Sequence, residues 1–166
     1  MITKEIIKNS LDAKWRKRQI NVWLFVLGAY AFIFLFAALI ATAKHGDFLL
    51  SIEISGLCAA VCLPILLPFL GYNLWKYHSL FQDPDKYSVY EVMLDKPETS
   101  YMYRGAIYYK VSFTDGDGNL VSKDTRPLWS SGIFDPCQLA DYNNKKVFVA
   151  YRETTDTLIG LGKEYK

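Results

Sequence analysis

The chain has 166 residues and a formal net charge of +2, and 51% of its residues are hydrophobic against 22% charged. The apolar residues are concentrated between Ile20 and Trp75, so the hydrophobic fraction of the whole chain averages a membrane-like part with an ordinary polar part. This distribution excludes a wholly soluble protein. The polar remainder after Gln82 has room for one small domain and no second one.

Residues 1–19 are predicted as a basic cytoplasmic N-terminal segment, which contains Lys4, Lys8, Lys14, Arg16, Lys17 and Arg18. Residues 20–43 follow and are predicted as the first transmembrane helix, because a helix needs about 20 apolar residues to cross about 30 Å of hydrocarbon. The core of a signal peptide has only about 7 to 15 residues, so we expect a retained anchor although Ala41-Thr42-Ala43 is similar to a cleavage site.

A short external loop at 44–47 separates this helix from a second apolar run at 48–76, which predicts a second transmembrane helix with a kink at Pro64 and Pro68. So short a loop predicts an antiparallel helical hairpin. Because the basic residues precede the first span, the positive-inside rule places both termini in the cytoplasm. We therefore expect the cytoplasmic (inner) membrane of a bacterium, with anionic headgroups attracting the basic segment.

Glu53 is an ionisable residue inside the second predicted span, where a charge is expensive. It can reach headgroups or pair with Lys44, or it can serve a transport path, and both interpretations stay open. Cys58 and Cys62 stand one helical turn apart, but their neighbours supply no further metal ligands, so we expect apolar packing. Small residues such as Gly56 and Ala60 permit close helix packing within the hairpin or between copies, which leaves a homo-oligomer open.

Residues 77–166 are predicted to hold a juxtamembrane segment and a cytoplasmic β domain. Residues 107–113 alternate apolar and polar side chains, as a half-buried strand does. Asp115–Asn119 predicts the turn of a hairpin. About five antiparallel strands without a long helix favour a small sheet or a partly closed barrel, with strands expected at 87–94, 107–113, 120–125, 146–151 and 157–161.

Signatures of catalysis and of cofactors are not found in the sequence, so we expect no enzyme, no cofactor and no metal. The chain has no phosphate-binding loop, no dinucleotide-binding glycine turn and no nucleophile elbow. Asp115, Asp117 and Asn119 have the spacing of a calcium loop, but Leu120 and Arg126 stand where glycine and glutamate are needed. Acidic residues outnumber basic ones after Gln82, which disfavours nucleic acid as a partner.

Two aromatic segments of the β domain are candidates for binding a protein partner. They carry residue types that are enriched in interface cores, and the candidate residues are Tyr101, Tyr103, Arg104, Arg126, Trp129 and Phe134. Trp129 suits the core of so small a domain as well as an interface.

The segments Tyr108–Phe113, Asp117–Asn119 and Asn144–Tyr151 resemble those of a bacterial family of unknown function that joins two membrane helices to a small β domain. The resemblance covers about half of the chain, and it implies the architecture without implying any functional residue. The chain has Asp141-Tyr142-Asn143-Asn144 where the family has a glycine-rich approach to its penultimate strand.

These observations predict a non-enzymatic inner-membrane protein whose cytoplasmic β domain binds another membrane or membrane-associated protein. Accessory subunits, immunity proteins and proteins of conjugative entry exclusion share this build, by analogy of architecture. The alternative is an oligomeric small transporter or channel component that uses Glu53 and the kinked second helix.

Overall fold

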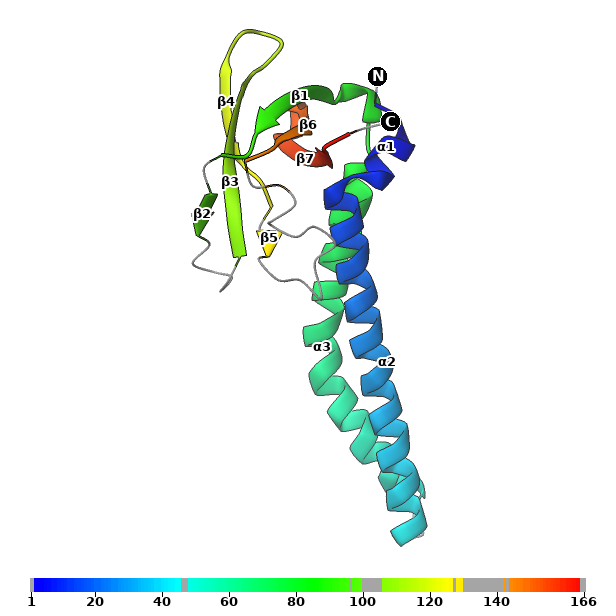
Figure 1. Cartoon of the computed structure of the whole chain (residues 1–166). Helices are drawn as coiled ribbons and strands as arrows, with labels where there is room; N and C mark the ends of the chain where they lie inside the picture. Colours follow the sequence, from blue (N-terminus) through cyan, green and yellow to red (C-terminus); the bar gives the residue numbers. More distant parts are fainter. Residues whose placement is uncertain are drawn as a thin grey trace. The chain divides into compact units, whose positions relative to one another are not determined.

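The computed structural model describes residues 2–45, 48–95, 97–99, 106–126, 128–129, 142 and 144–164 (Figure 1). The chain divides into two compact units. One unit combines Met1–Trp15 with His78–Lys166, and we call it the β unit; the other is Arg16–Tyr77, the helical unit. The first fifteen residues, which the sequence predicts as part of a basic segment preceding the membrane, therefore belong with the β strands.

The described residues form three α-helices, α1 (Lys4–Asn9), α2 (Leu11–His45) and α3 (Phe48–Leu80), and two short 3-10 helices, Pro84–Lys86 and Glu153–Thr155. Side-chain caps start the first two. The Thr3 hydroxyl accepts a hydrogen bond from the Ile6 N–H at 3.3 Å, and the Ser10 hydroxyl accepts one from the Ala13 N–H at 3.2 Å. The long helix α2 thus begins at Leu11, well before the predicted span.

In the helical unit, α2 and α3 pair in antiparallel directions. The rings of Trp23 and Phe69 are stacked with their centroids 5.1 Å apart. A second link is a hydrogen bond of 3.1 Å from the Arg16 guanidinium to the side-chain oxygen of Asn73. The Asn73 amide in turn donates to the Phe69 carbonyl. The predicted pairing of the two helices is confirmed.

One helix of the described residues, Leu11–Lys44, is long and apolar enough to cross a membrane by length and composition. Large apolar side chains are exposed along it, including Phe25, Phe32, Leu35 and Leu39. Pro64 and Pro68 both lie inside α3.

The β unit contains two antiparallel sheets. The first has the order β1 (Ser88–Met93), β6 (Lys146–Arg152), β7 (Thr157–Gly162). The second has the order β2 (Pro97–Thr99), β3 (Ala106–Thr114), β4 (Leu120–Asp124), and β5 (Leu128–Trp129) also pairs with β3. The five predicted strands are confirmed as β1, β3, β4, β6 and β7. The sequence missed β2 and β5, which are too short to show an alternating pattern.

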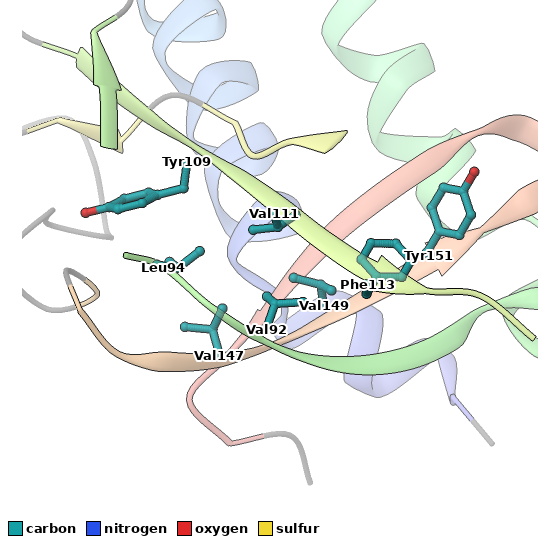
Figure 2. Packing of buried hydrophobic residues seen from close by; sticks show 8 residues of the cluster. All are labelled: Val92, Leu94, Tyr109, Val111, Phe113, Val147, Val149 and Tyr151. Atoms are coloured by element: carbon teal, nitrogen blue, oxygen red, sulfur yellow. The ribbon is translucent and has the colours of Figure 1, made fainter. Parts of the chain in front are cut away.

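The core lies between the two sheets, as Figure 2 shows. Strand alternation turns one side of β1, β3 and β6 towards it, and its buried members are Val92, Leu94, Tyr109, Val111, Phe113, Val147, Val149 and Tyr151. The Phe113 ring is central, because it stacks on Tyr90 at 4.4 Å and meets the edge of Tyr151 at 5.3 Å. These contacts join the sheets into one domain.

The turn between β3 and β4 is the predicted hairpin turn. The Asp115 carboxylate accepts hydrogen bonds from the backbone N–H groups of Asp117 and Asn119 at 3.0 and 2.7 Å. Gly118 has φ +87°, which glycine adopts without strain. The Asp115 carboxylate therefore organises the turn itself.

Candidate functional site

The candidate partner-binding residues fall mostly outside the described part of the chain. Tyr101, Tyr103, Arg104 and Phe134 lie outside the described residues. Trp129 is described through its backbone, which pairs with Ala106 in β5 and β3. Their role as an interface stays a prediction.

Arg126 is half-buried, just after β4. Its guanidinium carbon lies 5.7 Å from the centre of the Trp15 ring, where a cation is attracted to the π face. Arg126 also lines a small cavity together with Asp12 and Val149. The structure therefore places Arg126 against the N-terminal segment of the same unit.

Glu53 lies in α3 with an exposed side chain. Cys62, also in α3, is a half-buried free thiol. Within the described ranges, no group of three or more His, Cys, Asp or Glu side chains is placed to hold a metal ion.

A cluster of groups that the sequence did not single out forms where the ends of α2 and α3 meet the strands of the β unit. We call it the helix-end cluster and define it as Asp12, Tyr87, Arg152 and Gly160. Asp12 stands in the first turn of α2, and its carboxylate accepts a hydrogen bond of 2.6 Å from the Gly160 N–H. Gly160 belongs to β7, which is an edge strand among the described strands, so Asp12 satisfies a backbone donor on that strand.

The start of α2 approaches Gly160 closely, so an added side chain there would be tightly fitted. A Cβ on Gly160 would stand 3.3 Å from the Asp12 carboxylate oxygen and 3.6 Å from a methyl carbon of Leu11. Leu11 packs against the core of the β unit. The start of α2 is therefore fitted closely onto β7.

Arg152, at the end of β6, is the buried charged residue of the helix-end cluster, with only 2% of its surface exposed. Its guanidinium donates hydrogen bonds to the backbone carbonyl of Ser79, in the last turn of α3, and to that of Gln82, two residues after the helix. The last carbonyls of a helix have no partner within the helix and carry partial negative charge, so a cation there is favourable. Arg152 thus binds the end of α3 to β6.

Tyr87 completes the helix-end cluster. Its hydroxyl donates to the Leu80 carbonyl at 3.3 Å, and the Arg152 guanidinium lies 4.9 Å from its ring centre. Burial raises the pKa of Tyr87; the positive charge of Arg152 opposes this rise and the negative charge of Asp12 adds to it. The raised pKa keeps the Tyr87 phenol protonated, so Tyr87 can act as a hydrogen-bond donor. A general base would need the opposite, a lowered pKa that favours the phenolate.

A second polar network joins the two sheets. The Asp156 carboxylate accepts hydrogen bonds from the Tyr151 hydroxyl at 2.7 Å and from the Lys123 ammonium. These bonds hold the pKa of Asp156 below its ordinary value, with Lys123 the larger cause, and the bond to Asp156 raises the pKa of Tyr151 to about 12. The network fastens β4 to the turn between β6 and β7.

Among the described strands, β4 is the edge of its sheet in the order β2-β3-β4. Leu120, its first residue, has 77% of its surface exposed, and the alternate residues Ser122 and Asp124 are exposed as well. Edge strands offer backbone donors and acceptors with which another chain can pair. The two strands differ: the β7 residue Gly160 donates to Asp12, whereas alternate side chains of β4 are exposed.

No protein-family model, no curated protein and no solved structure matches this chain. The family resemblance drawn from the strand motifs stays an expectation. The grounds for a candidate function therefore come from the geometry of the chain and not from similar proteins.

The sequence contained weak signals for the helix-end cluster. Ile2 and Ile7 are apolar residues in a segment that topology alone would leave polar, and both are buried, Ile7 completely. Arg152 follows a continuous apolar run at 147–151, at the last position of β6. Both signals could have indicated that the N-terminal segment and the strand end are buried.

Proposed function

We propose that the chain is a non-enzymatic membrane protein whose β domain binds another protein at the cytoplasmic face of a bacterial inner membrane. In this proposal α2 and α3 both span the bilayer, and the basic residues before the apolar part of α2 keep both termini inside. The apolar side chains exposed along α2 support the bilayer as their surroundings, since water would make so large an apolar surface costly. The helix-end cluster would then hold the β domain to the ends of its two anchors.

The observation that carries the proposal of partner binding is the edge strand β4. Its exposed Leu120 offers an apolar contact. On the side away from β3, no described strand pairs with the backbone of β4, so that side offers donors and acceptors to an added strand. We propose a partner that adds an extended segment along β4 and places an apolar side chain on Leu120. Tyr101, Tyr103, Arg104, Trp129 and Phe134 remain predicted contributors. Accessory, immunity and entry-exclusion roles all fit such a partner.

A photoreactive amino acid at position 120, in the full chain in its native membrane, tests this proposal. The expected result is one dominant protein adduct whose crosslinked peptide is an extended segment. The matched control is the same probe at Thr154, which is exposed on the turn after β6, and it should give no such adduct. Equal labelling at both positions, or only lipid and self-adducts at position 120, would contradict the proposal. A probe at Trp129 separates core from interface at that residue.

The alternative function is a small oligomeric transporter or channel component. It is favoured by the exposed Glu53 carboxylate on an apolar helix that also contains two prolines. This function predicts that Glu53→Gln abolishes an ion or solute flux in proteoliposomes and leaves the unfolding temperature of the β domain unchanged. Unchanged flux would remove this alternative.

A further inference from the structure

A pocket of about 250 Å³ lies within the β unit, beside the start of α2. Ile6, Leu11 and Leu161 give it apolar walls. Its polar lining comes from three separate parts of the chain, represented by Asn9, Tyr142 and the backbone of Gly162. The pocket exists because the N-terminal segment packs on β7, so the polar region after Gln82 would not form it alone.

Basic residues outnumber acidic ones in the lining of this pocket, two to one. Lys14 and Lys163 both line it, and Glu164 is its acidic residue. Lys163 is held near the wall, since its ammonium lies 5.4 Å from the centre of the Tyr142 ring. A lining that contains two ammonium groups together with amide and backbone groups suits a phosphate, which accepts several hydrogen bonds and carries negative charge.

The short stretch of chain between Lys14 and the first predicted span limits how far the pocket can lie from that span. Lys14 precedes Ile20 by six positions, so these two residues are at most about 20 Å apart even if the chain between them is fully extended. This limit holds for any arrangement of the two units. If α2 is inserted in a bilayer, Lys14 is therefore within reach of the headgroup layer.

We infer that this pocket binds the phosphate headgroup of an anionic phospholipid, with Lys14 and Lys163 as its cationic contacts. The inference rests on the membrane anchoring in the proposed function and adds a defined lipid site to it. The apolar walls would face the glycerol and the first part of the acyl chains. Such a site would make the position of the β domain depend on anionic lipid.

The test is native mass spectrometry of the full chain in a mild non-ionic detergent, titrated with phosphatidylglycerol or phosphatidylcholine. We expect preferential binding of phosphatidylglycerol, weakened about tenfold in the Lys14→Gln/Lys163→Gln double variant. The control variant Lys110→Gln/Lys145→Gln removes the same charge from exposed positions outside the pocket and should bind as the wild type does. The Lys14→Arg/Lys163→Arg variant, which keeps the charge, should retain most of the binding and separates loss of charge from loss of folding.

Three results would overturn the inference: equal binding of the two lipids by the wild type, equal weakening in the control variant, or competition by sn-glycerol 3-phosphate at the concentration of the lipid. The last result would assign the pocket to a free phosphate ester. Carbonate extraction of wild-type membranes tests the anchoring separately. Release of the chain would overturn both proposals, whereas a retained chain without lipid preference would overturn this inference alone.

Discussion

The carboxylate of Asp12 accepts a hydrogen bond from the backbone N–H of Gly160 at 2.6 Å, although 148 positions separate the two residues in the chain. Asp12 belongs to the first turn of α2, and Gly160 belongs to the edge strand β7. One short contact therefore joins the beginning of the chain to its last strand. It also makes the N-terminal segment a structural part of the β unit.

Removing the Asp12 carboxylate should destabilise the β unit. A hydrogen bond to a charged acceptor contributes about 1.5 to 3 kcal/mol, so Asp12→Ala should lower the free energy of unfolding by about 2 kcal/mol. Asp12→Asn keeps an acceptor oxygen, so its free energy of unfolding should fall by less than that of Asp12→Ala. Chemical unfolding of the full chain in detergent measures the difference. Equal stability of the alanine variant and the wild type would show that this contact contributes nothing.

Adding one methyl group at Gly160 should have a similar effect by a different cause. The new Cβ would stand 3.3 Å from the Asp12 oxygen, so in Gly160→Ala the Asp12 carboxylate must shift and its hydrogen bond to Gly160 should weaken, at a cost of about 1 to 3 kcal/mol. Gly116→Ala is the matched control, because no atom lies within 4 Å of its added Cβ. Thermal unfolding of both variants compares them, and a loss of the same size in both would contradict a specific close approach.

Arg152 should be needed to hold the end of α3. Arg152→Met removes the buried guanidinium and leaves the carbonyls of Ser79 and Gln82 without this donor, at an expected cost of about 2 to 3 kcal/mol. Arg152→Lys keeps the positive charge but lacks the forked guanidinium, so its stability should lie between those of the wild type and Arg152→Met. Limited proteolysis between α3 and β1 should become faster in the same order. The exposed Lys110→Met is the control, and equal cleavage in all variants would be evidence against this role.

The Asp156 network should make stability depend on pH at both extremes. Because the folded pKa of Asp156 lies below its ordinary value of 3.8, its contribution is present above that pH and is lost as the pH falls through the folded pKa. The folded pKa of Tyr151 is raised to about 12, so its contribution is complete below pH 10 and is lost as the pH rises through about 12.

The unfolding temperature measured against pH for the wild type, Asp156→Asn and Tyr151→Phe tests this dependence. Asn is the suitable replacement because Asp156 has φ +50°, a conformation that Asn tolerates. The advantage of the wild type over Asp156→Asn should shrink below pH 3.8, and its advantage over Tyr151→Phe should shrink above pH 10. Differences that stay constant across these ranges would contradict the network.

Local pattern predicted most of the strands. Residues 107–113 alternate strictly because one side of β3 faces the core, and such a period of two is visible in the sequence. The turn at Asp115–Asn119 was equally visible, since Asp and Gly supply the side-chain acceptor and the positive φ that the turn uses. The short strands β2 and β5 left no such pattern. Their pairing depends on β3, which lies elsewhere in the chain.

The sequence by itself determined the long apolar helices, the five alternating strands and the hairpin turn, because each depends on residues close together in the chain. Only the tertiary structure decided that Met1–Trp15 belongs with the strands and that Asp12 and Arg152 hold the helix ends. The pocket beside Lys14 also depends on the tertiary structure, because its lining combines the N-terminal segment with residues near the C-terminal end of the chain. From its sequence alone, the basic N-terminal segment is expected to be solvated. It is not, because the Gly160 N–H of a distant strand donates a hydrogen bond to its Asp12 carboxylate, and no local sequence pattern indicates a partner so far along the chain.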